Sequence, residues 1–291
     1  MIPHFLVIGA PKAGTTWLDR NLRMHPEIWL PPEKELHYFD LPKNLPFTFF
    51  VFAPNRNDRY WVFNRLKRAY LRAKLDLDNA TWYLRYYFLP RTDYWYSSLF
   101  TPNESQVAGE VTPHYSAMDE LKIAGIRALS PDMKLIYILR DPIDRMWSHA
   151  AMSFSERFGY QGLDTMGEQA IAKYLRNPKH LIHAKYFENL QRWDKYFPQE
   201  QIFIGFFDEI IQAPESLLTT IFTFLGVTVS TEYISEIAQK RIFGHDYPPI
   251  PRRIGASLAE LLINDLENLH QRLDSPYTAK WLASAYGYLE K

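Results

Sequence analysis

The sequence contains no cysteine and carries no net charge. The absence of cysteine excludes disulfides, thiolate catalysis and metal sites with cysteine ligands, and it fits a reducing compartment. Lysine and arginine number 33, and aspartate and glutamate also number 33. The overall charge therefore gives no support for non-specific binding to nucleic acid or to an anionic membrane. Any site for an anion has to be local.

Long apolar runs are absent as well. No stretch approaches the length that a membrane-spanning helix needs. The first apolar strand begins at Phe5, almost at the initiator methionine, so we expect no secretory leader. From these absences we expect a cytoplasmic protein that neither inserts into membranes nor binds nucleic acid.

The residues that are present are typical of a globular α/β protein. Apolar residues make up 47% of the 291 residues, which is enough for a substantial core. Short apolar runs that suit buried parallel strands alternate with segments of helical periodicity. Because no linker or repeat divides the chain, we expect residues 1–291 to form a single domain with a central parallel sheet flanked by helices.

The expected elements follow these apolar patterns, and the last helix before the C-terminal region closes at Gly226. A Pro-rich loop is expected over 241–255, and two helical stretches complete a C-terminal region at 240–291. Strands are expected within 4–10, 106–111, 134–142 and 201–210, and helices within 15–26, 144–158, 184–197 and 214–226.

Residues 44–105 have an unusual composition, because aromatic side chains are mixed there with Arg and Lys. Amphipathic helices that pack the aromatic side chains onto the core explain most of these residues. An acceptor cleft with aromatic walls, or a lid, is the functional alternative for this insertion.

The segment "FLVIGAPKAGTTWL" predicts a strand, a glycine-bearing turn and a helix. Gly9 and Gly14 have the spacing of a phosphate-binding P-loop, but Thr15 stands at the position of its lysine, and Lys12 lies three residues earlier. Loop amides, the helix dipole, threonine hydroxyls and the Lys12 ammonium all favour an anion at this point. A tight turn without a ligand is the alternative, and we favour the anion site.

A second strand, in "KLIYILRDP", ends at Arg140 and Asp141. Asp141 could organise the Mg²⁺ of a nucleotide, but Arg140 directs a cation at the crevice where parallel strands end. A cation there suits a second anionic group better than a metal ion. A P-loop kinase that uses Mg-ATP and a non-catalytic nucleotide-binding or scaffold protein stay open as alternatives.

At this point the sequence resembles a known family. "GAPKAGTTWL" resembles the phosphosulfate-binding loop of sulfotransferases that use 3′-phosphoadenosine 5′-phosphosulfate (PAPS), and "YILRDPIDRMWSHAAM" resembles their 3′-phosphate-binding strand and helix. "HPEIWLPPEKELHYFD" and "GEVTPHY" are similar to segments of the carbohydrate, heparan-type branch. The resemblance, to bacterial-type members, covers roughly residues 4–230 in the family's order. It implies the sulfotransferase fold, which is like that of P-loop NTPases.

The resemblance also implies the chemistry of the donor. PAPS would be the co-substrate and adenosine 3′,5′-bisphosphate the product, with no metal. Arg140 and Ser148 would hold the 3′-phosphate, and Lys12 would stabilise charge on the leaving phosphate. The other donor-binding residues that it implies are Ala13, Gly14, Thr15, Thr16 and Trp17.

In the C-terminal region the match is poor. Arg252 and Arg253 are candidate ligands of the 3′-phosphate, and Arg241 competes with them. A solvent-facing arginine is the simpler alternative for each.

The acceptor needs a base to take the proton of its hydroxyl or amine. Glu35 matches the position of the catalytic glutamate in the carbohydrate branch, where the pattern is Glu-x-His-aromatic-Phe, and His37 would assist it. His37 could instead be the base, or a structural histidine. A surface carboxylate beside Lys34 is the alternative for Glu35.

Acceptor binding is expected from the segment "GEVTPHY", with Glu110, His114 and Tyr115 as candidates. The acceptor would be a small molecule or a carbohydrate. The carbohydrate branch usually has lysine where Val111 stands, which puts a sulfated polysaccharide in doubt.

Overall fold

The computed structural model describes residues 1–41, 70–71, 74, 76–77, 79–158, 167–230, 233–234 and 248–290. At its centre lies a five-stranded parallel sheet with the strand order β2-β3-β1-β4-β5. Every residue of β1 is buried, as expected for the central strand of a parallel sheet. The strands are β1 (Phe5–Gly9), β2 (Ile28–Trp29), β3 (Val107–Val111), β4 (Lys134–Leu139) and β5 (Ile202–Phe206).

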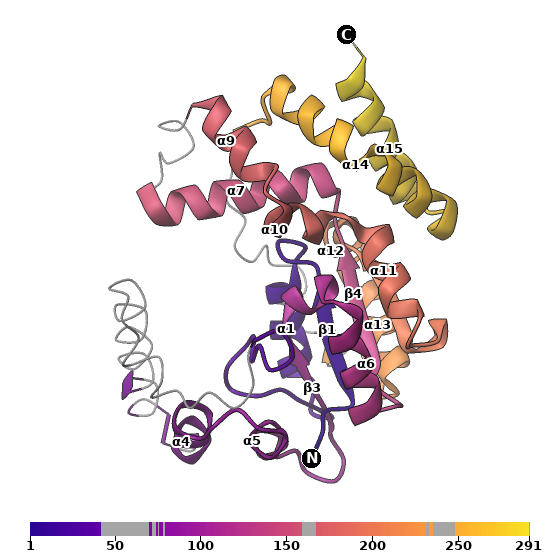
Figure 1. Cartoon of the computed structure of the whole chain (residues 1–291). Helices are drawn as coiled ribbons and strands as arrows, with labels where there is room; N and C mark the ends of the chain where they lie inside the picture. The colour runs from indigo at the N-terminus through magenta and orange to yellow at the C-terminus, as the bar shows by residue number, and fades with distance from the viewer. Residues whose placement is uncertain are drawn as a thin grey trace.

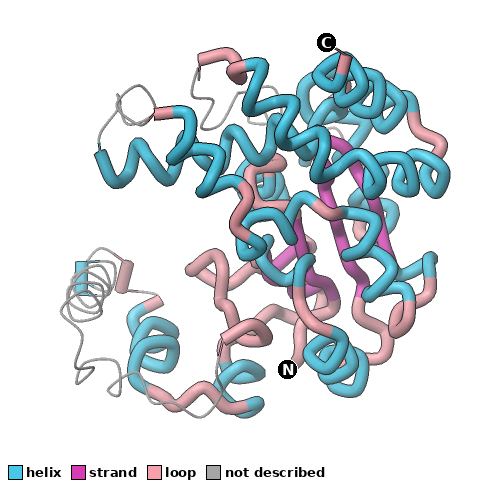
Figure 2. The backbone as a smooth tube through the Cα atoms, turned by 45° about the horizontal axis from the view of Figure 1, so that its top comes forward, coloured by secondary structure: helices cyan, strands magenta, loops and turns pink. Residues whose placement is uncertain are grey.

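Helices lie on both sides of this sheet, and Figure 2 shows the strands enclosed between them. In chain order the described helices are α1 (Thr15–Met24), α4 (Ala80–Phe88), α5 (Asp93–Ser98), α6 (Glu120–Leu129), α7 (Pro142–Phe158), α9 (Glu168–Leu175), α10 (Pro178–Leu181), α11 (Tyr186–Asp194), α12 (Phe207–Gln212), α13 (Pro214–Leu225), α14 (Arg252–Leu273) and α15 (Pro276–Leu289), with short 3-10 turns η1 (Pro113–Ala117), η2 (Ile182–Ala184) and η3 (Gln199–Gln201). None of the helices within these described residues is both long and apolar enough to cross a membrane.

The connections from the centre of the sheet run in opposite directions. β1 leads through α1 to β2, whereas β3 leads through α6 to β4 on the far side of β1. Since parallel crossovers are right-handed, α1 and α6 cover opposite faces, and Figure 1 shows helices on both sides of the strands. The loops that follow β1 and β4 therefore open beside each other at the carboxyl edge, where ligands bind in sheets of this kind.

The C-terminal helices complete this end of the molecule. α14 packs along α15 and also contacts α7 and α11, and Figure 1 shows the pair α14 and α15 at the end of the chain. The Pro-rich loop expected over 241–255 ends earlier than predicted, because α14 begins at Arg252, directly after Pro251. Residues 241–247 of that loop lie outside the described residues.

The strand expected within 201–210 is also shorter in the structure than predicted. The apolar run 201–210 forms β5 only as far as Phe206, and α12 begins at Phe207. The carboxylate of Glu209 accepts the backbone N–H of Phe206 at 2.7 Å, which satisfies a free amide at the helix start. Capping therefore ends the strand although the apolar pattern continues. The expected Gly226 closure of α13 is present, with a left-handed φ of 80°.

The aromatic segment can be followed where the structure describes it. Trp82, Tyr86 and Trp95 stack in series between α4 and α5 and are buried, whereas Phe88 and Tyr94 are exposed. Most described aromatic residues of this segment thus pack into a core, as amphipathic helices do. Residues 42–69, where a lid was the alternative, lie outside the described part of the chain.

The close contact between β1 and β3 gives a test of the sheet. Gly109 pairs with Phe5, and a Cβ at Gly109 would lie 2.2 Å from the buried Phe5 ring. We expect Gly109→Ala to lower the free energy of unfolding by about 1–3 kcal/mol in urea denaturation, because overpacking strains a close-packed core.

Gly125→Ala is the matched control. Its Cβ would meet nothing within 4 Å on the exposed side of α6, so we expect a gain of about 0.5–1 kcal/mol from helix propensity. Equal effects of the two substitutions would contradict the β1–β3 register.

Candidate active site

A cavity of about 1450 Å³ opens at the carboxyl edge of the sheet. Its walls come from the loop after β1, the loop after β2, the loop and helix after β4, and the helices α12 and α15. Most residues expected from the sequence to bind donor or acceptor line it: Lys12, Gly14, Thr15, Thr16, Trp17, Glu35, His114, Arg140 and Ser148.

The loop after β1 forms one end of this cavity. Lys12 and Gly14 have left-handed backbones, with φ of 70° and 86°, and α1 begins at the next residue, Thr15. A Cβ on Gly14 would lie 2.5 Å from the side chain of Ile210, so both the backbone and the space require glycine. This geometry directs the start of α1, with its positive dipole, into the cavity.

Cations surround that loop. Arg140, at the end of β4, donates to the carbonyl of Lys12 at 3.2 Å and lies over the Phe207 ring. The Lys12 ammonium lies 3.4 Å from the sulfur of Met152 on α7. Two cations, a helix start and threonine hydroxyls in one place fit an anionic ligand such as a phosphosulfate.

Lys34 connects this end of the cavity to the other. Its ammonium lies 3.1 Å from the hydroxyl of Thr16 and 3.4 Å from that of Thr15. The same ammonium lies 3.4 Å from a carboxylate oxygen of Glu35. The sequence presented Lys34 only as a neighbour of Glu35, and its contact with residues far along the chain was not predicted.

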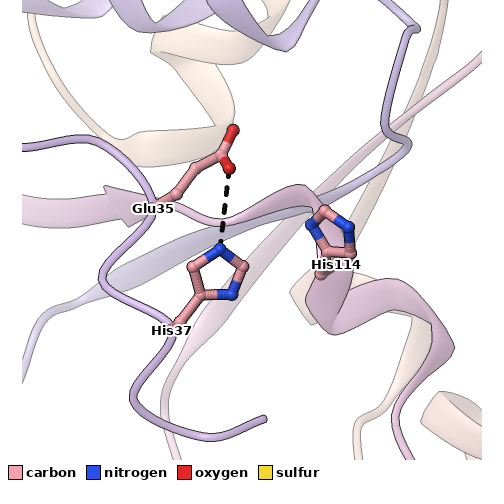
Figure 3. A group of neighbouring side chains, drawn as sticks. All are labelled: Glu35, His37 and His114. Carbon is pink, nitrogen blue, oxygen red and sulfur yellow. Dashed lines mark ion pairs between the residues drawn. The ribbon is translucent and has the colours of Figure 1, made fainter. Parts of the chain in front are cut away.

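Glu35, His37 and Asp40 form a connected series on the loop after β2. Nε2 of His37 lies 3.6 Å from Glu35, and Nδ1 of His37 lies 2.8 Å from Asp40. Figure 3 shows Glu35 and His37 with His114, which comes from the start of η1. Asp40 was not predicted from the sequence, although its spacing of three from His37 was the available signal.

The charges of this series reinforce one another. Burial alone would raise the pKa of Glu35, but the hydrogen bond from His37 and the Lys34 charge outweigh it and lower the pKa to about 2. Burial would lower the pKa of His37, but Asp40 and Glu35 raise it to about 9. At neutral pH the pair is therefore a carboxylate and an imidazolium.

His114 faces the same space. Its ring centre lies 5.3 Å from that of His37 and 5.1 Å from that of His183. Desolvation by the surrounding side chains and the neighbouring His37 charge lower the pKa of His114, so its imidazole is neutral at physiological pH. A neutral imidazole can accept a hydrogen bond from an acceptor hydroxyl or amine.

The structure places Glu110 and Tyr115, the other two candidates for acceptor binding, away from the cavity. Both are fully buried and neither lines the cavity. Glu110 accepts from the hydroxyls of Tyr96 (2.6 Å), Tyr115 (3.1 Å) and Thr112 (3.2 Å). These residues lie behind the loop that carries Glu35 and support it through the Tyr115 hydroxyl.

Three donor-side residues are also placed differently from the expectation. Ala13 is buried and its amide donates to Ala10, so neither its side chain nor its N–H reaches the cavity. Arg252 and Arg253 lie in the first turn of α14, and neither lines the cavity. Arg252 donates to the carbonyl of Glu290 at 2.6 Å. The cation that α15 contributes to the cavity is Lys280, which was not predicted.

Together, these features define an α/β protein with a parallel sheet and a cation-rich cavity at the carboxyl edge of its strands. A family model for the sulfotransferase domain matches residues 2–246. The chain belongs to this sulfotransferase family, which confirms the resemblance seen in the sequence.

Curated relatives and a solved structure agree with this family. The chain is 24% identical over 242 residues to human bifunctional heparan sulfate N-deacetylase/N-sulfotransferase 2, covering 80% of this chain and 23% of the relative. It is 25% identical over 228 residues to mouse heparan sulfate glucosamine 3-O-sulfotransferase 3A1, covering 78% and 46%. The chain thus spans between about a quarter and half of the length of these relatives.

A sulfotransferase from Alicyclobacillus acidocaldarius has a similar solved structure, with a TM-score of 0.62 at 20% identity, covering 97% of this chain and 99% of that one. This likeness confirms the expected fold.

The buried carboxyl of Glu110 predicts a pH dependence of stability. Burial raises its pKa from 4.5 to about 7, although hydrogen bonds from Tyr96, Tyr115 and Thr112 oppose the rise. Between these values the unfolded chain loses the proton while the folded chain keeps it. The contribution of Glu110 to the free energy of unfolding is therefore greatest below pH 4.5 and decreases by roughly 3 kcal/mol up to pH 7.

We expect Glu110→Gln to remove this decrease, measured by urea denaturation at several pH values. Glu120→Gln is the control, because Glu120 lies at the surface and pairs with Lys195. An unchanged pH slope in Glu110→Gln would show that the buried carboxyl does not titrate in this range.

Proposed function

We propose that this chain is a sulfotransferase that uses PAPS as its donor and transfers the sulfuryl group to an acceptor hydroxyl or amine. The observation that carries the proposal is one cavity with two chemically different ends. The donor end offers Lys12, Arg140 and the start of α1, and the acceptor end offers Glu35 and His114. The family to which the chain belongs supports the same reaction.

On the donor side, the chain's residues would bind two anionic groups. The amides at the start of α1 and the Lys12 ammonium would bind the phosphosulfate, and Arg140 and Ser148 would bind the 3′-phosphate. During transfer, the acceptor atom bonds to sulfur as the bond from sulfur to the bridging oxygen breaks. Lys12 counters the charge that develops on the leaving phosphate.

On the acceptor side, Glu35 would take the proton that the acceptor loses. Its pKa of about 2 makes it a weak base towards an ordinary hydroxyl. A late proton transfer resolves this, because the acceptor hydroxyl becomes strongly acidic once its oxygen bonds to sulfur. His37, charged and held by Asp40, would orient the Glu35 carboxylate. The neutral His114 would help to position the acceptor.

The acceptor class that we propose is a small molecule or a carbohydrate. The two curated relatives are named as heparan sulfate sulfotransferases, which supports a carbohydrate. Val111, where the carbohydrate branch usually has lysine, is buried on β3 and offers no charge. Lys34 is the cation beside Glu35 in this chain.

The kinase alternative is not favoured. Asp141, its candidate for organising Mg²⁺, accepts the backbone N–H groups of Ile143 (2.8 Å) and Asp144 (3.2 Å) and so caps the start of α7. Burial and the Asp144 charge raise the pKa of Asp141 to about 7. A carboxyl used in this way is poorly suited to hold the metal of a nucleotide.

Calorimetric titration with adenosine 3′,5′-bisphosphate in the presence of EDTA tests the donor site. We expect one nucleotide bound per chain, and we expect Lys12→Ala and Arg140→Ala each to weaken binding about 10–100-fold, because each removes a charge-assisted hydrogen bond.

Arg253→Ala is the matched control, because it removes the same charge outside the cavity and we expect it to leave the affinity unchanged. Binding that required Mg²⁺ and favoured ATP would support the kinase instead. If Arg253→Ala weakened binding as much as Arg140→Ala, the cavity would not be the donor site.

Steady-state kinetics with labelled PAPS and a panel of sugar, phenol and amine acceptors test the acceptor side. We expect Glu35→Gln to lower kcat by about 10²–10⁴-fold, because it removes the group that takes the proton. The dissociation constant for adenosine 3′,5′-bisphosphate serves as the control and is expected to stay the same. A Glu35→Gln variant with normal kcat would assign the base to another residue.

A further inference from the structure

Glu35, His37 and His114 form a group whose geometry suits more than proton transfer. Each offers one ligand atom, and these atoms all lie within 4.8 Å of one another. Figure 3 shows the three side chains in one group, two from the loop after β2 and one from the start of η1. Two imidazoles and one carboxylate are the donor set of many sites for divalent transition metals.

The partner of His37 strengthens this reading. Nδ1 of His37 is 2.8 Å from Asp40, which leaves Nε2 directed towards Glu35. A histidine ligand in a metal site usually donates its other ring N–H to a carboxylate, which fixes the tautomer and orients the ring. Asp40 and His37 already have this arrangement, so the His37 ring is oriented with its Nε2 available as a ligand atom.

The distance between the Glu35 and His37 ligand atoms is close to that of a tetrahedral site. Two ligands about 2.0–2.1 Å from a zinc ion lie about 3.4 Å from each other at the tetrahedral angle. The Glu35 oxygen and His37 Nε2 are 3.6 Å apart. His114 is exposed and lines the cavity, so an ion can reach the group from there. Its ligand atom lies within 4.8 Å of the other two and has to move closer to complete the site.

We propose that Glu35, His37 and His114 bind a divalent transition-metal ion, Zn²⁺ above all, and that this ion blocks the acceptor end of the cavity. The metal replaces the proton between His37 and Glu35 and takes the carboxylate lone pair that would receive the acceptor proton. Water from the cavity, which Glu35 and His114 line, would complete the coordination. The inhibitory consequence rests on the proposed function, whereas metal binding does not.

The two imidazoles also determine which metal ions the site prefers. Imidazole nitrogen suits Zn²⁺, Co²⁺, Ni²⁺ and Cu²⁺, whereas Mg²⁺ and Ca²⁺ prefer oxygen ligands throughout. We therefore expect Mg²⁺ in millimolar excess neither to occupy the site nor to displace Zn²⁺. The sequence analysis expected no metal anywhere in the site, and this proposal departs from that expectation at the end of the cavity opposite the donor residues.

Metal binding can be measured without any turnover. We expect Co²⁺ to give a visible absorption band with one ion per full-length chain, and Zn²⁺ to abolish the band by displacement. His114→Ala removes a ligand at an exposed position, so the core stays intact, and we expect loss of the band. Asp40→Asn keeps all three ligands, and we expect about 10–100-fold weaker Co²⁺ binding from the loss of the orienting carboxylate.

His270→Gln is the matched control. It removes an imidazole that contacts Thr278 in the C-terminal helix pair, away from the group, and we expect the band and the affinity to be unchanged. Retention of the band in His114→Ala, its loss in His270→Gln, or the absence of a one-to-one complex in the unmodified chain would each overturn the metal site.

The inhibitory consequence is tested separately by kinetics. We expect Zn²⁺ to inhibit sulfuryl transfer in competition with the acceptor and not with PAPS, and EDTA to restore the rate. Competition with PAPS alone would overturn the proposed location of the block. If the chain transferred no sulfuryl group at all, the Co²⁺ titration would still decide on the metal site, so failure of the function and failure of the site are distinguishable.

Discussion

The hydroxyl of Tyr115 holds the acceptor-side loop on the sheet, and the geometry of the acceptor side depends on it. It donates to Glu110 on β3 and accepts the backbone N–H groups of Tyr38 (2.8 Å) and Phe39 (3.4 Å). The loop needs this support because Glu35 has a left-handed backbone, which costs a non-glycine residue about 1–3 kcal/mol unless its surroundings enforce it. Glu110, a buried carboxyl that does not line the cavity, thereby helps to fix the position of the Glu35 carboxylate.

The loops after β1 and β4 show how a local pattern becomes a site. The backbone N–H of Ala10 donates to Ile138 at 2.7 Å, and Arg140 donates to the carbonyl of Lys12. These bonds join the end of one strand to the end of its neighbour. β1 and β4 are parallel and adjacent. Lys12, which follows β1, and Arg140, which follows β4, therefore lie close together although they are far apart in the sequence. Strand order alone brings Arg140 to the loop after β1.

This explains which parts could be predicted from the sequence. The strands could be predicted from apolar runs, and the turn before α1 could be predicted from the glycine spacing, because both signals lie within a short stretch of sequence. The end of β5 at Phe206 depends on the hydrogen bond from its backbone N–H to the Glu209 carboxylate. The buried Glu110 carboxyl is satisfied by the hydroxyls of Tyr96, Thr112 and Tyr115, which stand at other positions of the sequence. Position in the family's motif made Glu110 resemble an acceptor ligand, whereas only the packing of α5 and η1 around β3 shows that it is enclosed.

The missing lysine of the P-loop pattern has a physical counterpart in the folded chain. Thr15 stands where that lysine would be, and the Lys34 ammonium lies 3.4 Å from its hydroxyl. The charge is therefore supplied from the loop after β2 instead of from α1. A lysine on α1 would serve only the donor, but Lys34 also contacts Glu35. Because the Lys34 ammonium lies between the start of α1 and the Glu35 carboxylate, the charge of the proposed donor would act on the pKa of Glu35. An anion at the start of α1 would draw Lys34 towards itself and weaken its hold on Glu35, which raises the basicity of that carboxylate when the donor is in place.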